Sequence, residues 1–326
     1  MTDRGWRKIL KGDVTPLAET VARIGEAAAS YRARSGIAPQ AERGKSWMLP
    51  EAKSEKLVYV AAGEVYVYAY GTNKLVGTLS RIGGTLYECS DKHGDVSVAV
   101  PGGASQPGVY EYAHGGTEPI NYFSVAGAVA CAVDPSSGNL AITNGGPTVY
   151  IYQNASGLPE AYTDDDEYTT DVAYDDSGNL FVDGFSETAS FLLSELPAKG
   201  GSFENITVDG SEGGNGENPI FWDGQYLDLG SYQSAKRRRS SQEALQRLAI
   251  SGTTATIAGY TPLGIQVEPS HVQFWIDGGV AIQVSTKPQK ISVIQYFAYP
   301  RGRSTKKLKI QVLPRAVGLT VSAASR

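Results

Sequence analysis

Residues 164–167 place four acidic side chains next to one another: Asp164, Asp165, Asp166 and Glu167. Hard cations such as Ca²⁺ are bound by several carboxylate oxygens. This run is therefore a candidate Ca²⁺ site, with Asp164 and Asp166 as the expected ligands. Adjacent acids cannot all point at one ion, and the spacing is not that of an EF-hand loop, so a solvated acidic loop is the alternative. No other cofactor is expected.

Five further residues are candidates for ligand binding. Asn144, Asp171 and Asp183 are polar residues beside or within apolar β-type runs. His271 precedes another such run and Trp275 lies inside it, so the two could line a pocket; the alternative for His271 is an ordinary loop histidine. The three histidines of the chain form no Ser-His-Asp arrangement that the sequence reveals, and no catalytic residue is assigned.

A second set of acids recurs once per repeat, in Gly-containing turns. Asp can close such a turn with its own side chain, and Gly tolerates positive φ. A turn requirement explains why the acid returns in each repeat, so we interpret these residues as structural. They are Asp91, Asp134, Asp175, Asp223 and Asp277.

Two basic runs stand out in a chain whose net charge is −5. The first is KRRR at 236–239. The second is a hairpin that carries Arg301, Arg303, Lys306, Lys307 and Lys309. Either could touch nucleic acid or an acidic partner, but we interpret both as solvated charge runs. An acidic chain argues against generic polyanion binding, and no nucleic-acid partner is expected.

The elements that must position these residues repeat along the chain. The pattern VYVYAYGTNKLVGTLS at 65–80 returns at 109–124 and 149–164, and looser copies follow at 190–208, 245–263 and 293–312. A period of about 40–55 residues with β-hairpins inside each unit is typical of propeller blades. We therefore predict an all-β fold, a six-bladed β-propeller with four-stranded antiparallel blades.

The first unit is short by one strand, because 57–60, 65–70 and 76–79 supply only three. Residues 315–323 follow the sixth unit and resemble residues 127–133, which form an inner strand in the third. An open ring would leave an unpaired strand edge. We expect the C-terminal strand to become the innermost strand of blade 1 and so to close the ring.

The N-terminal residues follow a different pattern. Thr15-Pro16 is a helix-start signal, and apolar residues then recur at helical spacing. We predict a short helical extension over 16–34, a linker after it, and two domains: 1–50 as extension and linker, and 51–326 as propeller.

Cys89 and Cys131 each fall in the first strand of consecutive repeats. Two buried small hydrophobic residues are the simpler expectation, and a disulfide between neighbouring blades near the axis is the alternative. Reach cannot be judged from the sequence.

No apolar run approaches the length of about 20 residues that a membrane span needs, and the first residues lack the apolar core of a signal peptide. With 41% hydrophobic and 19% charged residues, the composition is that of a globular protein. We expect a monomer.

With the repeats aligned, the chain resembles bacterial propellers of the NHL-repeat type, closest to exported members of uncharacterised function. The resemblance rests on the blocks at 90–98, 109–120 and 133–144, and it covers about residues 49–323. It implies the six-bladed fold and an exported location. NHL-like propellers include binding scaffolds, lactonases and lyases, so it leaves the function open.

Two functions fit these residues. The first is a non-enzymatic scaffold that presents loops to a protein or surface glycan partner, since no catalytic constellation is found. The second is a metal-dependent lactonase or hydrolase at the axial mouth. A lactonase of the gluconolactonase type would hold a divalent metal through residues of separate inner strands, for which Asn144, Asp171 and Asp183 are the candidates.

Overall fold

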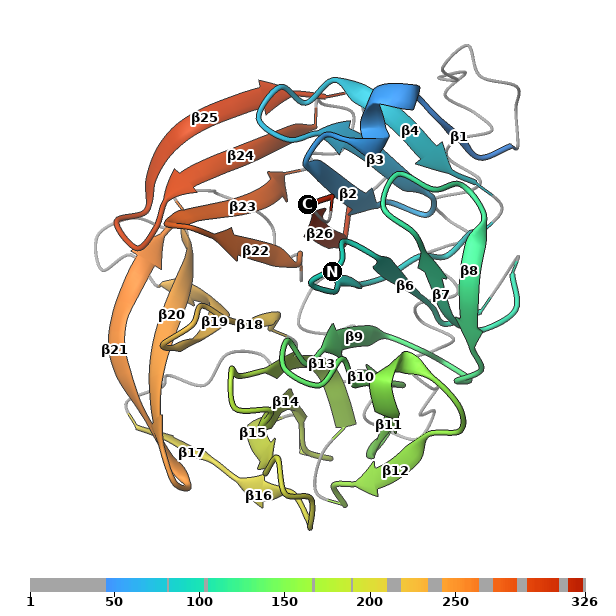
Figure 1. The fold of residues 1–326 in the computed structure, drawn as a ribbon. Helices are drawn as coiled ribbons and strands as arrows, with labels where there is room; N and C mark the ends of the chain where they lie inside the picture. Colours follow the sequence, from blue (N-terminus) through green and yellow to red (C-terminus); the bar gives the residue numbers. More distant parts are fainter. Residues whose placement is uncertain are drawn as a thin grey trace.

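The computed structural model describes residues 45–80, 82–102, 105–165, 168–188, 190–209, 218–233, 242–263, 272–285, 292–310 and 316–324. These residues form six separate sheets that stand as blades around a central axis, and Figure 1 shows the ring face-on. Nearly every pairing within a blade is antiparallel, as in up-and-down hairpins. The predicted six-bladed β-propeller is confirmed.

The blades follow one another along the chain. Blade 1 holds, from the outside inward, β1 (Trp47–Met48), β4 (Leu75–Leu79), β3 (Val65–Ala69), β2 (Leu57–Ala61) and β26 (Gly318–Ser322). Blade 2 holds, from the inside outward, β5 (Glu88–Ser90), β6 (Val96–Val100), β7 (Gly108–Tyr112) and β8 (Pro119–Phe123). Blade 3 holds β9 (Ala130–Val133), β10 (Leu140–Thr143), β11 (Thr148–Tyr152) and β12 (Glu160–Thr163).

The other three blades have the same plan. Blade 4 holds β13 (Tyr168–Tyr174), β14 (Leu180–Phe185), β15 (Phe191–Leu196) and β16 (Glu204–Asn205). Blade 5 holds β18 (Ile220–Trp222), β19 (Leu227–Gln233), β20 (Gln242–Ser251) and β21 (Thr254–Pro262), with β17 (Thr207–Asp209) added outside. Blade 6 holds β22 (Phe274–Asp277), β23 (Val280–Ser285), β24 (Val293–Ala298) and β25 (Arg303–Lys309).

The apolar core is divided into layers between consecutive blades. Strand residues alternate between the two faces of a sheet, so each blade offers one apolar row to the blade before it and one to the blade after it. Between blades 1 and 2, for example, Tyr59 and Val67 pack with Val98. Equivalent layers separate every other neighbouring pair of blades. Each layer exists only while both blades are in place.

The ring closes as the sequence predicts. β26 pairs antiparallel with β2 along its whole length, with Leu319 opposite Val60, and becomes the innermost strand of blade 1. Gln273, which immediately precedes β22 of blade 6, reinforces this closure. Its side-chain oxygen accepts hydrogen bonds from the N–H groups of Leu319 (2.9 Å) and Glu88 (3.0 Å), so one amide joins blades 6, 1 and 2.

Cys89 and Cys131 form a disulfide with a Cα–Cα distance of 5.7 Å. The simpler expectation of two unbonded residues is therefore wrong, although both are buried. The reason is geometric. β5 and β9 are innermost strands of consecutive blades, and near the axis such strands are close enough for the Cα separation that a disulfide needs.

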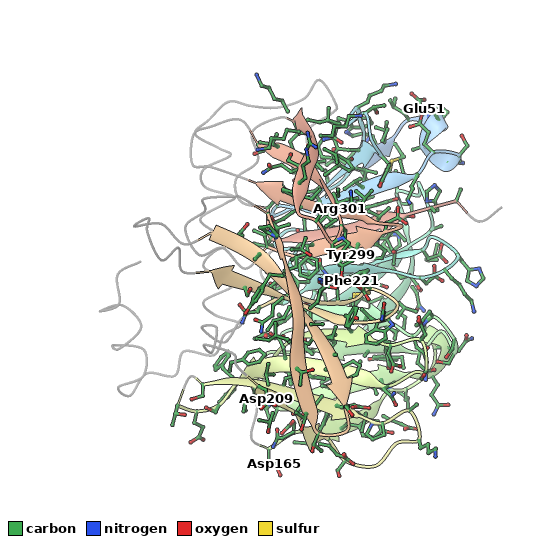
Figure 2. All side chains as sticks on the ribbon, turned by 90° about the vertical axis from the view of Figure 1, so that its left-hand side faces the viewer. Glu51, Asp165, Asp209, Phe221, Tyr299 and Arg301 are labelled. Atoms are coloured by element: carbon green, nitrogen blue, oxygen red, sulfur yellow. A yellow bond between two sulfur atoms is a disulfide. The ribbon has the colours of Figure 1, made fainter. Side chains whose placement is uncertain are left out.

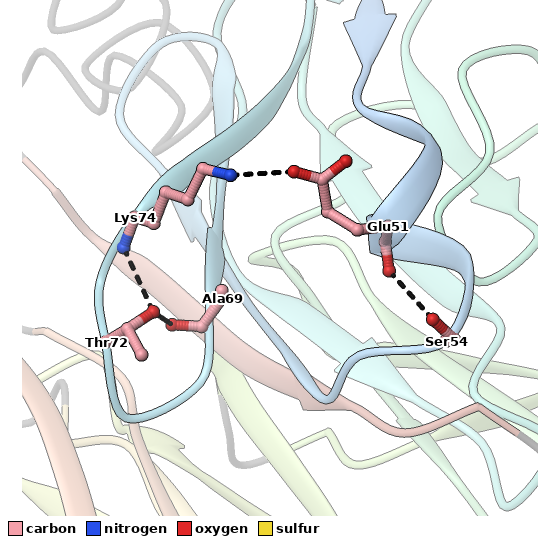
Figure 3. A network of polar contacts seen from close by, with 5 residues as sticks. All are labelled: Glu51, Ser54, Ala69, Thr72 and Lys74. Carbon is pink, nitrogen blue, oxygen red and sulfur yellow. Dashed lines mark hydrogen bonds and ion pairs between the residues drawn. The ribbon is translucent and has the colours of Figure 1, made fainter.

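The segment before β2 is fastened to the outside of blade 1. β1 pairs with β4, with Met48 opposite Gly77, where a Cβ atom would collide with the methionine side chain. The 3₁₀ helix η1 (Pro50–Lys53) follows, and Glu51 forms an ion pair of 2.7 Å with Lys74, as Figure 3 shows. A second 3₁₀ helix, η2 (Gln153–Ala155), follows β11.

The helix predicted over 16–34 lies outside the described residues, and the division of the chain at residue 50 stays a prediction. No helix among the described residues is long and apolar enough to cross a membrane.

The closing strand provides a stability test. Leu319→Ala should reduce the free energy of unfolding by about 2–5 kcal/mol, because the side chain is fully buried in the layer between blades 6 and 1. Leu158→Ala is the matched control, since Leu158 is 91% exposed. It should change stability by less than about 0.5 kcal/mol. Urea unfolding followed by tryptophan fluorescence measures both, and equal effects of the two substitutions would contradict this account of closure.

Candidate functional site

The acidic run at 164–167 is only partly described. Asp164 is buried at 7% exposure, and its N–H donates to the Pro147 carbonyl at 2.8 Å, whereas Asp165 is exposed. Asp166 and Glu167 lie outside the described residues. Within the described part of the chain, no group of three or more His, Cys, Asp or Glu side chains could hold a metal ion. The Ca²⁺ site therefore stays a prediction.

The structure brings Asp171 and Asp183 together. They lie opposite each other in β13 and β14 of blade 4, beside a register shift between Thr169 and Asp171, and both are buried. They face the innermost strand of blade 5. The pair is therefore at the junction of two blades, close to the axis, as an axial ligand set would require.

Hydrogen-bond donors occupy every oxygen of this carboxyl pair. Asp183 Oδ1 accepts from the N–H of Asp171 (2.7 Å) and the hydroxyl of Thr170 (2.8 Å), and its Oδ2 accepts from the N–H of Asn218 (3.1 Å). Asp171 Oδ2 accepts from the N–H of Ile220 (3.0 Å), at the start of β18. The two acids thus connect blade 4 to blade 5 through backbone donors that would otherwise be buried without partners.

Burial raises the pKa of Asp171 well above its usual range, and the neighbouring Asp183 raises it further. Two carboxyl groups this close do not both ionise readily, and a protonated carboxyl carries no negative charge with which to attract a cation. Their chemistry in this structure is that of hydrogen-bond acceptors between blades.

The other candidate residues are dispersed. Asn144 follows β10, and its side-chain oxygen accepts from the N–H of Gly146 at 3.0 Å, which closes its own loop. Trp275 in β22 packs edge-on against Phe221 of blade 5, with ring centroids 4.9 Å apart. His271 lies outside the described residues. Among the described candidates, Asp171 and Asp183 share a hydrogen bond, whereas Asn144 and Trp275 contact other residues.

The recurring turn acids are structural, as expected. The side chains of Asp91, Asp134, Asp175 and Asp223 each accept from backbone N–H groups of their own turns. Asp277 differs, because it forms an ion pair with Lys56 of blade 1.

A serine–histidine pair that the sequence did not reveal lies at the closure. Ser322 of β26 is 2.6 Å from His114 Nδ1, and its hydroxyl also reaches the Gly94 carbonyl. Ser322 is completely buried. A nucleophile must be reachable by its substrate, so this pair fastens β26 to blade 2 and does not form a hydrolytic site.

Sequence reasoning also missed a cluster between blades 5 and 6. The hydroxyl of Tyr299, in the turn after β24, reaches the carboxyl groups of Asp223 and Asp228, the latter at 2.7 Å. Arg247 of β20 lies opposite Asp228 of β19. Figure 2 shows Tyr299 near Phe221 on this side of the ring. The available signal was Asp228 itself, an acid between Leu227 and Leu229 in a β strand.

One hydroxyl group has one hydrogen, so Tyr299 can donate to only one of its two carboxyl neighbours. The other contact is a hydrogen bond only if that carboxyl carries a proton. Burial raises the pKa of Asp228 to about 8, partly offset by Tyr299 and Arg247. Protonation of Asp228, which its raised pKa favours, would let both contacts of Tyr299 be hydrogen bonds at once.

These sheets and contacts define the chain as a six-bladed β-propeller whose deep polar groups connect its blades. No protein-family model matches the chain, and a search of the curated proteins found no match either. Among solved structures, dihydro-heme d1 dehydrogenase NirN in complex with DHE matches at 14% identity and a TM-score of 0.44, over 85% of this chain and 67% of that one. At this level of similarity we transfer nothing from it, and the fold assignment depends on the sheets alone.

The contact between blades 4 and 5 can be tested by removing one carboxyl. Asp183→Ala leaves the N–H groups of Asp171 and Asn218 without their acceptor, whereas the Thr170 hydroxyl keeps the Asp183 backbone carbonyl. Buried unsatisfied donors cost about 1–3 kcal/mol each, so we expect a loss of at least about 2 kcal/mol in the free energy of unfolding. The control is Asp176→Ala, at an exposed turn position. Urea unfolding measures the free energy of unfolding of both variants. If Asp183→Ala is as stable as the control, Asp183 does not connect blades 4 and 5 in the way described.

The Tyr299 cluster predicts a pH dependence. Because the folded pKa of Asp228 is about 8 and its ordinary value is 3.8, this group favours the folded state fully below about pH 4 and loses that contribution as the pH rises towards 8. It contributes up to about 1.4 kcal/mol per pH unit. Asp228→Asn should remove this slope, and the exposed Asp176→Asn should keep it.

Urea unfolding of wild type and both variants at several pH values measures these slopes. The difference between wild type and variant isolates Asp228 from the other buried acids. Identical slopes in wild type and Asp228→Asn would show that this carboxyl does not hold the proton.

Proposed function

We propose that this chain is a non-enzymatic binding propeller that presents its loops and blade edges to a protein or glycan partner. The observation that supports this best is the state of Asp171 and Asp183. These were the axial candidates for a metal-dependent lactonase, and their oxygens already accept hydrogen bonds that connect blades 4 and 5. A metal would have to displace those donors, and each displaced donor would stay buried without a partner.

The same use of polar groups is found elsewhere near the axis. Gln273 connects three blades, and Ser322 with His114 fastens the closing strand. Polar groups that already hold the ring together have little capacity left for a substrate. We therefore place the functional surface on the outside of the ring.

We also propose that the protein is exported, acts as a monomer and has blades of the NHL-repeat type. The disulfide between Cys89 and Cys131 supports an exported location, because disulfides persist in oxidising compartments and are rare in the cytosol. The blade type rests on the resemblance of the repeats at 90–98, 109–120 and 133–144.

A metal and activity measurement separates this proposal from the lactonase. Wild-type protein is dialysed against a chelator and assayed for bound metal, for lactone hydrolysis with and without added Ca²⁺ or Zn²⁺, and for a metal-induced shift in melting temperature. We expect substoichiometric metal, hydrolysis at the buffer rate and no shift, because the axial carboxyls are engaged. In parallel, the tagged protein is cross-linked in its native cells to identify a stable partner.

Metal-dependent hydrolysis that is lost in Asp183→Ala and kept in Asp176→Ala would establish the lactonase. Both variants are assayed at a temperature where circular dichroism shows them folded, so that loss of structure is not mistaken for loss of a ligand.

A further inference from the structure

The outer edge of blade 6 is strongly basic. β25 is the terminal strand of its sheet, and together with the turn before it β25 exposes Arg301, Arg303, Lys306, Lys307 and Lys309. Among the described residues, none of these five side chains forms an ion pair. Lys306 donates to the Gly71 carbonyl of blade 1. We call this surface the blade 6 edge.

The charge of the chain is unevenly distributed along the sequence. Residues 93–235, which span most of blades 2 to 5, contain 21 of the 34 acidic residues and only one of the 29 Lys and Arg residues, Lys199. That stretch has a net charge of −20, and the remaining residues have +15, which together give the net −5 of the chain. Blade 6 lies across the ring from blade 3 in Figure 1. In Figure 2, Arg301 is likewise far from Asp165 and Asp209.

The outer edges of this propeller accept additional strands. β1 pairs with β4 at the edge of blade 1, and β17 pairs in parallel with β21 at the edge of blade 5. Both blades therefore have five strands. In the described part of the chain no strand pairs with the outer side of β25, which is the side where an additional strand would bind.

We propose that the blade 6 edge binds an acidic polypeptide segment, which adds to β25 as a fifth strand. The proposal deepens the binding function above and rests on it, because it names the surface and the chemistry of the partner. Main-chain hydrogen bonds to the strand edge would supply affinity, and the five cations would select the acidic sequence.

We take the partner to be another molecule, because among the described residues no acidic strand lies beside β25. Residues 1–44 contain eight Lys and Arg against five Asp and Glu, so their charge has the wrong sign. The described acidic residues of 93–235 belong to blades 2 to 5 and their connections.

A short polypeptide fits this edge better than a longer polyanion does. β25 has seven residues, or about 23 Å at 3.3 Å per residue. A nucleic acid or an anionic membrane that extended beyond it would meet the acidic blades. Cations on an edge strand repel another cationic strand and so discourage pairing between two such edges. An acidic strand carries the opposite charge and is attracted to the same edge.

The test uses the full chain and a fluorescent peptide of about twelve residues that alternates Glu and Val, with binding followed by anisotropy at low salt. The variant is Lys307→Glu with Lys309→Glu, two exposed positions. The control is Lys92→Glu with Lys199→Glu, which are also exposed and make the same change in net charge away from blade 6. We expect the variant to bind at least about tenfold more weakly and the control to stay within about twofold of wild type.

Three further probes decide between occupants. The same peptide with alternate backbone amides N-methylated should not bind, because it cannot pair as a strand. Single-stranded DNA of equal charge and anionic vesicles should bind more weakly than the peptide. The proposal would be overturned if DNA or vesicles bound more tightly than the peptide, or if the methylated peptide bound as well as the unmodified one. It would also be overturned if the protein associated with itself at low salt and the variant with Lys307→Glu and Lys309→Glu did not.

Failure of this inference is distinguishable from failure of the binding function. If wild type does not bind the peptide, the inference is wrong whatever the metal and lactone assays show. If those assays reveal metal-dependent hydrolysis, the proposed function is wrong whatever the peptide does.

Discussion

The pairing of β26 with β2 is the interaction on which the rest of the structure depends. A propeller has no single core, and each apolar layer is formed by two blades. The chain reaches blade 1 twice, at β2 and again about 260 residues later at β26, and only this second return buries both faces of every blade. The Gln273 amide bonds to Leu319 and to both backbone groups of Glu88, so the same closure orients blade 2.

Polar groups near the axis serve the same purpose around the ring. Blades 2 and 3 are joined by the disulfide, blades 3 and 4 by Thr143 bonding to the Thr170 carbonyl, and blades 4 and 5 by Asp171 and Asp183. Glu88 is an exception, because it is fully buried and neither of its carboxyl oxygens has a regular hydrogen-bond partner. Burial raises its pKa well above the usual range, and the nearby Ala61 backbone offsets only part of that without forming a regular hydrogen bond. Burial of this kind favours the neutral form of the carboxyl.

The fold followed from the sequence because its signals are periodic. Alternating strands, the missing strand in the first unit and the matching tail predict six blades and their closure, and each signal is local or repeats. The roles of individual residues did not follow, because they depend on which strands become neighbours at the axis. The disulfide was only an alternative, and the meeting of Asp171 with the N–H of Ile220 joins residues 49 positions apart. The Tyr299 cluster joins residues of blades 5 and 6, and the pattern within one repeat does not show which residues of the next blade lie beside it.

Polar groups bonded inside the ring contribute to stability, whereas exposed charges on the rim remain available for binding. A polar group already bonded inside the ring gains little from a ligand, because a new hydrogen bond must replace an existing one and the net difference is small. An exposed charge on the rim, such as that of Lys307, has no ion-pair partner among the described residues. Its electrostatic field is screened only by solvent and salt until a partner binds. Since Gln273, Asp171 and Asp183 are committed to neighbouring blades, the free energy for recognition is available mainly at the outer edges. Those edges already differ between blades, with β1 over β4, β17 over β21 and cations along β25.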